Sequence, residues 1–306
     1  MSSFAELLVT QRRVSDLDKM FELVGWEKFR YRIKKLLDRS PDGRPPYDEI
    51  CMFRIMILQN LYNLSDRQME EMLYDRLSFR RFCGFGLESS LPDATTILRF
   101  RNLLQGQSEK LLQMVNEQLI QKGISWSGGS IIDATVIESA YKIPPGGEQS
   151  PVDSEAGWTK KRGKYVYGYK AHVSTTKQGL IRKTKATSAD IYDGLVFAPL
   201  LDGTETKTYA DKAYGSKNNR KLLKDHGIKD GLLHKKPKGK ELAESLKVLN
   251  KINSRIRSGV ERTFAHLKTV LGYRTARYKG WDKNQTHLDL LAIAYNLKRS
   301  LRLAIG

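Results

Sequence analysis

The stretch from residue 130 to residue 136 reads Ser-Ile-Ile-Asp-Ala-Thr-Val, a run of apolar and β-branched residues with one acid at its centre. Such a run predicts a short, buried β-strand. An ionised Asp inside a buried strand is costly unless it is paired or bound to a metal ion. Asp133 is therefore a candidate for chemistry, with a structural Asp at a strand end as the alternative.

The segments after this strand predict a mixed sheet. Residues 164–175 alternate as a strand, and residues 180–186 pair with it as a hairpin. Two further strands are expected at 206–210 and 231–234, a loop at 142–159, and helices at 190–201, 216–226, 241–272 and 286–303. We therefore expect a mixed five-stranded sheet flanked by helices, of the α+β or α/β class, an order that resembles ribonuclease-H-like nucleases.

The first 125 residues predict helices alone. Helical spacing of apolar residues covers 21–37, 50–64, 66–77, 94–104 and 109–122, with a Pro/Gly break at 41–46. Short helices with small-residue turns suit a DNA reader of the helix-turn-helix kind, with Arg99 and Arg101 on one helix. A helical dimerisation module fits the same pattern. We expect two domains, a helical one at 1–125 and a sheet-containing one at 126–306.

The charge balance indicates a polyanionic partner. The 306 residues include 53 Lys and Arg against 34 Asp and Glu, which gives a net charge of +19 and a pI of about 9.8. Nucleic acid is the expected partner. A membrane surface is not expected, because the chain lacks a run of about 18 apolar residues and residues 1–14 lack a signal-peptide order. Cys51 and Cys83 predict buried free thiols rather than a metal site.

The second acid of interest ends a predicted central strand. Asp211 follows the strand 206–210, and the carboxyl ends of central strands are where open α/β sheets present their ligands. Its rivals are Asp190, which suits a helix cap, and Asp202, which precedes a glycine turn. Asp193 is a weaker candidate for an outer position around the site.

The third acid lies on a predicted helix between two cations. At 100° per residue, Arg257, Glu261 and Lys268 fall within about 40° of one another. The two cations could hold phosphates. An ordinary Arg–Glu pair one helical turn apart is the alternative. His266 points about 140° away from Glu261 on the same wheel, so it is not expected to act as a ligand beside it.

A basic segment lies between the first two acids. Residues 155–185 hold nine basic residues against one acid: Lys160, Lys161, Arg162, Lys164, Lys170, Lys177, Arg182, Lys183 and Lys185. Aromatic residues interleave at Trp158, Tyr165, Tyr167 and Tyr169. Phosphate neutralisation with base stacking is one interpretation. A solvated hairpin with alternate tyrosines in the core is the other. A second cluster at 235–240 predicts a flexible loop that follows the DNA backbone.

The acidic segments resemble the DDE transposases of bacterial insertion sequences, in particular the fifth insertion-sequence group. Ile-Asp-Ala-Thr-Val-Ile-Glu-Ser (132–139) resembles the first acidic motif, and Tyr-Ala-Asp-Lys-Ala-Tyr-Gly-Ser (209–216) resembles the second. Arg257-x3-Glu261-x6-Lys268 resembles the third. Wider versions of that motif place a Tyr where this chain has Ser254. The resemblance covers nearly the whole chain, including the basic segment 158–172.

The resemblance implies a ribonuclease-H-like core in which Asp133, Asp211 and Glu261 are catalytic and hold two Mg²⁺ ions, for which Mn²⁺ can substitute. Such a pair of ions suits phosphodiester cleavage, because it activates the attacking oxygen and stabilises the leaving one, and Mg²⁺ prefers carboxylate oxygens. The expected DNA contacts are Lys160, Lys161, Arg162, Lys164, Lys170, Arg257 and Lys268.

The same resemblance implies strand cleavage and strand transfer on double-stranded DNA, at the terminal inverted repeats of the element and at a target. It also implies a homodimer or higher oligomer in a synaptic complex, in the bacterial cytoplasm at the nucleoid. Two other functions stay open. One is an endonuclease without strand transfer. The other is a DNA-binding regulator descended from a transposase, which would need a broken acidic triad.

Overall fold

The structure is a computed structural model that describes residues 14–37, 46–124, 126, 128–141, 144–145, 147–161 and 163–303. Short helices come first, and several begin at a side-chain cap, such as Ser15 and Ser65, each in a capping box. They are α2 (Asp16–Glu22), η1 (Trp26–Phe29), α3 (Arg30–Lys34), α4 (Glu49–Leu61), α5 (Asp66–Asp75), α6 (Leu77–Cys83), α7 (Ala94–Leu103) and α8 (Ser108–Gln121).

These helices follow the sequence prediction with two differences. The helix expected at 21–37 is wrong, since α2 ends at Glu22 and the chain continues as η1 and α3. The helix α6 was not expected. Most of the Pro/Gly break at 41–46 lies outside the described residues. Cys51 is half-buried and Cys83 is buried, and both thiols are free.

Arg101 has a structural role, because it is not exposed as a residue that contacts DNA would have to be. Its guanidinium is buried and donates two hydrogen bonds to Asp66, at 2.5 Å and 2.8 Å between nitrogen and oxygen. This charged pair ties α7 to α5. Arg99, two residues earlier, is exposed.

The sheet has seven strands rather than the five that were expected. They are β1 (Ser130–Ser139), β2 (Gly157–Lys161), β3 (Lys164–Thr176), β4 (Ile181–Ser188), β5 (Lys207–Ala210), β6 (Lys229–Leu232) and β7 (Thr275–Ala276). The five expected strands lie in the order β4-β3-β1-β5-β6, antiparallel among the first three and parallel among the last three. The additions are β2, beside the first half of β3, and β7, beside the end of β1.

The remaining helical elements are η2 (Asp193–Val196), η3 (Ala198–Leu200), η4 (Lys212–Tyr214), α9 (Lys217–Asp225), α10 (Glu244–Arg257), α11 (Gly259–Thr269) and α12 (Trp281–Leu303). The helix expected at 190–201 is wrong, because two 3-10 turns replace it and Pro199 lies in the first turn of η3. The helix expected over 241–272 is interrupted between α10 and α11, at Ser258.

Alternation along β1 divides the core between the two faces of the sheet. Ile131 and Ile137 belong to a large apolar cluster that includes residues of α4, α8, α11 and α12. Ile132 belongs to a small cluster on the other face, with residues of η2, η3, η4 and α9. The helical region followed by a mixed sheet with helices on both faces is the ribonuclease-H-like α+β arrangement that the sequence predicts.

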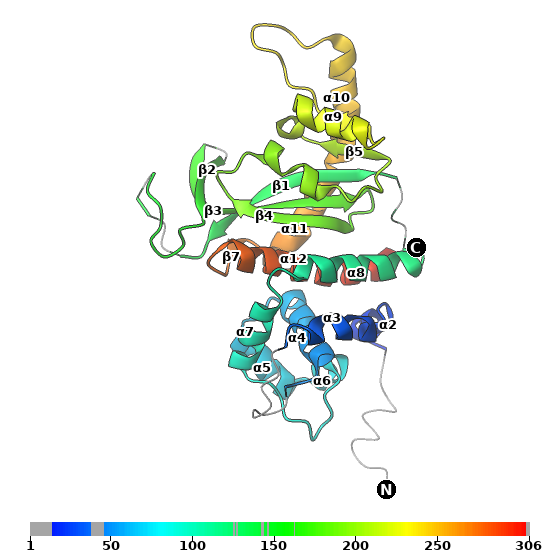
Figure 1. The fold of residues 1–306 in the computed structure, drawn as a ribbon, viewed down its shortest axis with the longest axis vertical. Helices are drawn as coiled ribbons and strands as arrows, with labels where there is room; N and C mark the ends of the chain where they lie inside the picture. The colour runs from blue at the N-terminus through cyan, green and yellow to red at the C-terminus, as the bar shows by residue number, and fades with distance from the viewer. Residues whose placement is uncertain are drawn as a thin grey trace.

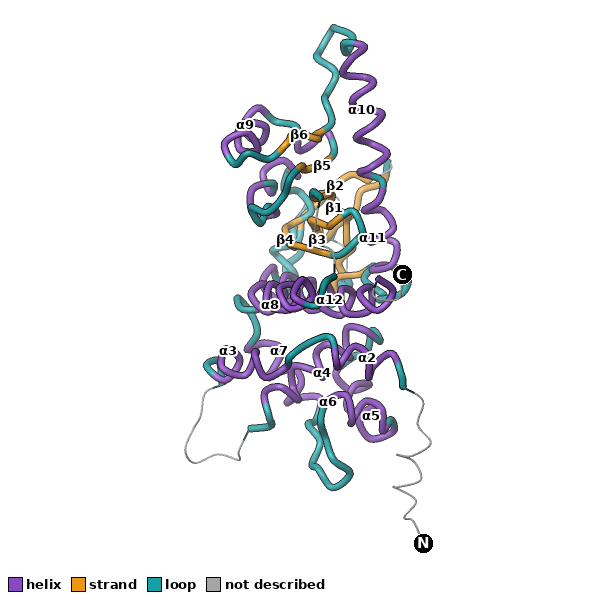
Figure 2. The backbone as a smooth tube through the Cα atoms, turned by 90° about the vertical axis from the view of Figure 1, so that its right-hand side faces the viewer, coloured by secondary structure: helices purple, strands orange, loops and turns teal. Residues whose placement is uncertain are grey.

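The long helix α12 joins the two parts of the molecule. It packs against β4 and α8 on one side and against α4 and α2 on the other. Figure 1 and Figure 2 show α8 and α12 as a layer between the first helices and the sheet, with α10 projecting at the far end. None of the helices in the described residues is both long and apolar enough to cross a membrane.

A buried carboxylate on α12 links this helix to α8 and to β4 by hydrogen bonds. Asp289 of α12 is fully buried and accepts a hydrogen bond from Ser108 Oγ of α8, at 2.6 Å. Its other oxygen accepts hydrogen bonds from Thr184 Oγ1 of β4 and from Gln285 Nε2. Burial raises the pKa of Asp289 to about 7, although these three hydrogen bonds act in the opposite direction.

Replacing Asp289 with Asn is expected to flatten the pH dependence of stability. The folded pKa of about 7 lies above the ordinary value of 3.8, so the contribution of Asp289 is full below about pH 4 and is lost as the pH rises through about 7. The whole effect is on the order of 4 kcal/mol. The measurement is the free energy of unfolding in urea between about pH 4.5 and 8, roughly the range in which Asp289 titrates.

The exposed Asp282, in the first turn of the same helix, provides the matched control. Asp282→Asn removes the same charge at the protein surface, and its unfolding free energy should change with pH as that of the wild-type protein does. Equal slopes for wild-type protein and Asp289→Asn would show that the buried carboxyl group does not titrate in this range.

Candidate active site

Asp133 lies at the centre of β1, on the face that α11 covers. It is half-buried, and its Oδ1 accepts the Ala134 backbone N–H at 2.9 Å. The pKa of Asp133 is raised to about 6, mainly by burial. The Ala134 hydrogen bond and Arg257 act in the opposite direction, and the carboxylates of Asp211 and Asp193 add to the increase. A half-buried carboxylate that faces two others is a site where a cation would be stabilised.

Asp211 is the neighbour of Asp133 across two parallel strands. In the register of β1 and β5, Ile131 pairs with Tyr209 and Ile132 pairs with Ala210. One step further along both strands come Asp133 and Asp211, on the face of Ile131 and Tyr209. Asp211 also begins η4, because its Oδ1 accepts the Lys212 N–H at 2.7 Å. Strand order and alternation thus bring the first two predicted acids together.

Glu261 approaches this pair through Arg257. The Arg257 guanidinium donates to Asp133 Oδ2 at 2.6 Å, and its other terminal nitrogen lies 3.7 Å from Glu261 Oε1. The Glu261 side chain is 65% exposed, whereas those of Arg257 and Asp133 are about 20% exposed. The Arg–Glu pair that the helix wheel predicts is therefore present, but the shorter contact of Arg257 is with Asp133.

The described residues contain no group of three His, Cys, Asp or Glu side chains placed to hold a metal ion. Two of the three predicted acids, Asp133 and Glu261, instead contact Arg257. Its guanidinium lies between Asp133 and Glu261 and neutralises the more buried of the two carboxylates. A cation that binds Asp133 through Oδ2 must therefore compete with Arg257.

The rival acids have other partners. Asp202 accepts hydrogen bonds from both sides of the Arg182 guanidinium, at 2.8 Å and 2.7 Å, which makes it structural. Asp193 forms an ion pair with Lys170 at 2.8 Å. Asp190 is exposed and lies just after β4. Of these, Asp193 raises the pKa of Asp133 and so lies within electrostatic reach of the candidate site.

Two family models match the chain. Residues 6–103 match a family described as Transposase domain (DUF772), and residues 127–297 match one described as Transposase DDE domain. The second match covers more than half of the chain. The chain belongs to the DDE transposases. No solved structure matches it. As a member of this family the protein is expected to act on DNA, and the matched DDE domain contains β1, β5 and α11, from which the three acids come.

The donors in this DDE domain suit a divalent metal ion by their chemistry. Asp133, Asp211 and Glu261 offer oxygen ligands only, which Mg²⁺ prefers over nitrogen and sulfur. Burial is the main cause of the raised pKa of Asp133, and the negative charge of Asp211 contributes to it. A bound cation would relieve the repulsion between the two carboxylates.

Lys268 lies further along β1 than Arg257 does. Its Nζ donates to the carbonyl of Val136 at 3.0 Å. Burial and, to a lesser extent, the nearby ammonium of Lys161 on β2 lower the pKa of Lys268 to about 8. Two ammonium groups from different elements thus lie close together beside β1. An anion such as a phosphate between them would offset their mutual repulsion.

The predicted DNA contacts on β2 and β3 fall into two groups. Lys160, Lys161 and Lys164 are exposed, whereas Lys170 is half-buried and donates to the Ile191 carbonyl as well as pairing with Asp193. Arg162 lies outside the described residues. Tyr167 and Tyr169 are buried and donate to Asp153, so they are core residues, whereas Tyr165 is 71% exposed.

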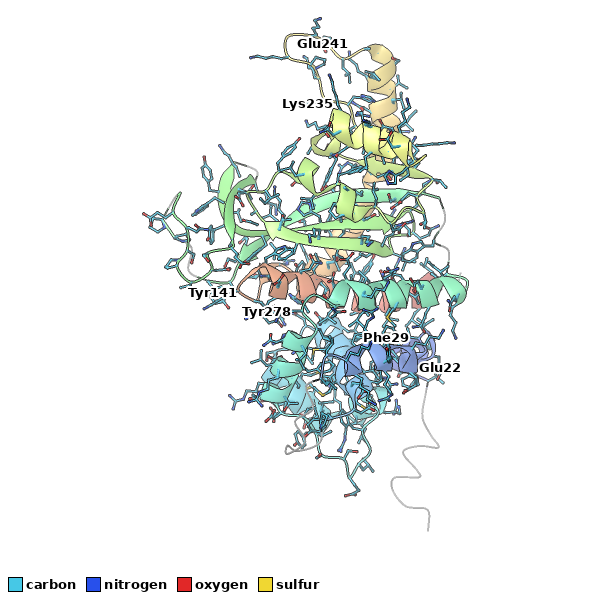
Figure 3. The ribbon with its side chains drawn as sticks, in the orientation of Figure 1. Glu22, Phe29, Tyr141, Lys235, Glu241 and Tyr278 are labelled. Carbon is cyan, nitrogen blue, oxygen red and sulfur yellow. The ribbon has the colours of Figure 1, made fainter. Side chains whose placement is uncertain are left out.

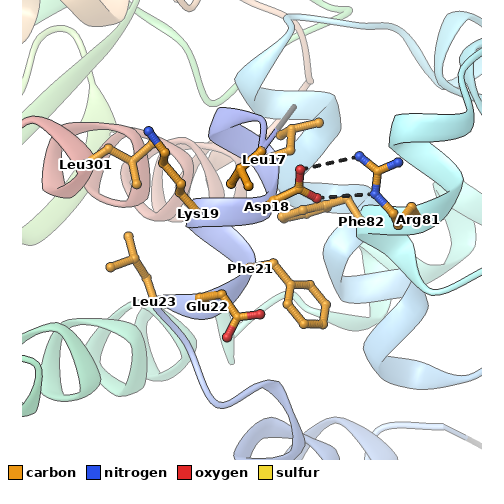
Figure 4. A pocket seen from close by; sticks show the side chains of 10 residues that line it. Leu17, Asp18, Lys19, Phe21, Glu22, Leu23, Arg81, Phe82 and Leu301 are labelled. Atoms are coloured by element: carbon orange, nitrogen blue, oxygen red, sulfur yellow. Dashed lines mark hydrogen bonds and ion pairs between the residues drawn. The ribbon is translucent and has the colours of Figure 1, made fainter. Parts of the chain in front are cut away.

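Other features of the surface lie away from the acids. The basic loop between β6 and α10 reaches the outer end of the molecule, where Figure 3 labels Lys235 and Glu241. An apolar recess of about 680 Å³ lies between α2, α6 and the end of α12, beside the Asp18–Arg81 ion pair (Figure 4). No local pattern in the sequence indicates the contact of Arg257 with Asp133, because 124 positions separate the two residues.

Proposed function

We propose that this DDE transposase binds the terminal inverted repeats of an insertion sequence, cleaves their strands with Mg²⁺ and transfers them to target DNA. The observation that carries the proposal is the placement of Asp133 within β1 and of Asp211 directly after the neighbouring parallel strand β5, with Glu261 linked to Asp133 through Arg257. Membership of the fifth insertion-sequence group stays a prediction.

In this proposal the three carboxylates hold the metal ions, which supply the activation of the attacking oxygen and the stabilisation of the leaving oxygen. Arg257 is released from Asp133 and, with Lys268, positions phosphate oxygens by charged hydrogen bonds. Lys160, Lys161 and Lys164 attract the DNA backbone along β2 and β3. Arg162 and Lys170 are proposed for the same surface.

For residues 1–125 we propose recognition of the element ends or assembly of the oligomer. The exposed Arg99 on α7 is available for DNA. The helix α8 packs against both α12 and β4, so the helical region is in direct contact with the sheet. A synaptic complex of two or more copies would hold both ends of the element.

The proposed reaction is tested by incubating the purified protein with labelled element ends, a target plasmid and Mg²⁺, and mapping the products. Joined end–plasmid molecules that form only with Mg²⁺ or Mn²⁺ are the expected result. Cleaved ends without joined products would indicate an endonuclease without strand transfer. Binding without any cleavage would indicate a DNA-binding regulator.

A further inference from the structure

A basic recess lies where the turn between β3 and β4 meets α11 and the last turns of α12. Its volume is about 250 Å³. The side chains that give it its charge are Lys177, Arg262, Lys298, Arg299 and Arg302, and the imidazole of His266 lies beside them. Among the described residues that line it, none is acidic. A concave site with several cations and no carboxylate favours an anionic ligand.

Three separate elements supply these cations. Arg262 and His266 lie one turn apart on α11, Lys298 and Arg302 lie one turn apart on α12, and Lys177 lies in the turn after β3. Basic residues at the end of a helix stabilise it by themselves through the helix dipole. This effect accounts for Arg302, in the last turn of α12, but not for Lys298, Arg262 or Lys177.

Arg299 fixes the geometry of the recess. Arg299 donates from Nε and Nη2 to the Gln178 carbonyl, at 3.1 Å and 3.0 Å, which ties α12 to the β3–β4 turn. The turn needs Gly179, whose φ is +86°. A Cβ atom there would also lie 3.3 Å from Thr263 Oγ1 of α11. The recess is therefore formed by the fold and not by mobile side chains alone.

The other cations have no opposite charge beside them. In the part of the chain that the structure describes, Lys177, Arg262, Lys298 and Arg302 form no ion pair with a carboxylate. The buried Nε2 of His266 has no hydrogen-bond partner. Burial lowers the pKa of His266, and the charges of Lys298, Arg302 and Arg299 lower it further. An anion in the recess would offset this uncompensated positive potential.

The recess lies on the same face of the sheet as the candidate active site. Gly259 borders it, and a Cβ atom at Gly259 would lie 3.5 Å from Ile131 of β1. Lys177 follows Thr176, which pairs with Ser130 at the start of β1. Asp133 is three residues further along β1, about 10 Å at 3.3 Å per residue. Along the axis of a DNA duplex, this distance from Ser130 to Asp133 corresponds to about three phosphates of one strand.

We propose that this recess binds backbone phosphates of the DNA strand that leads away from the candidate active site. The proposal rests on the proposed function, because it takes DNA as the source of the phosphate. Arg262, Lys298 and Arg302 would donate to the phosphate oxygens, with Lys177 at the rim. The ligand chemistry is phosphate without base recognition, so the contact would be independent of sequence.

The test is the salt dependence of duplex DNA binding by the full-length protein. The variant Arg262→Gln/Lys298→Gln/Arg302→Gln removes three charges from exposed or half-buried side chains. Each lost phosphate contact lowers the slope of log K against log salt by about 0.9, so the slope should fall by about 3. The single variant Arg302→Gln should lower the slope by about 1. Melting temperatures establish that the variants are folded.

The matched control is Lys217→Gln/Lys221→Gln/Lys224→Gln on α9, which covers the opposite face of the sheet. It removes the same charge, so any general effect of net charge is equal in both triple variants. Equal slopes for the two would overturn the proposal while leaving the proposed function intact.

A second arm separates the two sources of phosphate. Inorganic pyrophosphate is titrated against wild-type protein and both triple variants, and melting temperature is measured. If the wild-type protein binds no DNA, the proposed function fails. Stabilisation by pyrophosphate that only the recess variant loses would then overturn DNA as the source and identify a free phosphate compound as the ligand.

Discussion

Cleavage of element-end DNA is expected to fall by about a thousandfold or more when Asp133, Asp211 or Glu261 loses its charge, a change of about 4 kcal/mol in the barrier. The variants are Asp133→Asn, Asp211→Asn and Glu261→Gln, which keep the size of each side chain. DNA binding should survive, because each variant removes a negative charge from a basic protein. Single-turnover cleavage with Mg²⁺, beside gel-shift affinity, gives both quantities.

Two comparisons make this result decisive. Asp225→Asn, at the exposed end of α9, removes an acid far from β1 and should cleave as the wild-type protein does. Asp193→Asn tests the rival second ligand, which now pairs with Lys170. Normal cleavage by Asp211→Asn together with loss of cleavage in Asp193→Asn would mean that the second metal ligand is misassigned.

Truncation of the two cations beside the acids should slow the reaction by tenfold or more, about 1.4 kcal/mol or more in the barrier. Arg257→Ala removes the guanidinium that bridges Asp133 and Glu261, and Lys268→Ala removes the ammonium beside Lys161. If Arg257 served only as a surface partner of Glu261, its loss would cost about 0.3–0.5 kcal/mol of stability and would leave the rate unchanged. Cleavage rates at saturating DNA and melting temperatures distinguish the two roles.

Arg255 is the matched control for the pair. It is equally basic, lies two residues before Arg257 on α10 and is exposed. Two residues on a helix are about 200° apart, so Arg255 faces away from β1. Arg255→Ala should keep the saturated rate. Similar rate losses at all three positions would indicate a general effect of charge, and Arg257 and Lys268 would then have no special place in the site.

The strands that the sequence predicted are those with a clear local pattern. The β-branched run of β1 and the alternation of β3 indicate strands without any knowledge of their partners. The two additional strands depend on long-range pairing. The strand β7 has only Thr275 and Ala276, and it exists because the chain after α11 returns to the end of β1. The 3-10 turns at 193–200 replace a predicted helix where Gly194 packs tightly against Tyr192 and the Ala213 carbonyl.

In the candidate site, too, features with a local sequence pattern could be predicted and features that depend on long-range contacts could not. The local pattern places Asp133 inside one strand and Asp211 at the end of another, whereas the pairing of β1 with β5 and its register, which bring the two acids together, come from the structure. The burial of Arg101 against Asp66 and the contact of Arg257 with Asp133 also come from the structure, since each joins residues far apart in the chain. Helical spacing predicted the pairing of Arg257 with Glu261, four residues further along the chain, but not the contact of Arg257 with β1. Tertiary packing makes the contact of Arg257 with Asp133, at 2.6 Å, shorter than its contact with Glu261, at 3.7 Å.

The position of α12 has a consequence for the order in which the newly made chain can fold. Its residues complete the core of the first helices as well as the helical cover of the sheet. Asp289 contacts Ser108 across 181 positions, and Asn296 contacts Asn116 across 180. During synthesis both parts of the molecule therefore lack part of their core until α12 leaves the ribosome. Folding should be slow, and chains released before α12 should be prone to aggregation.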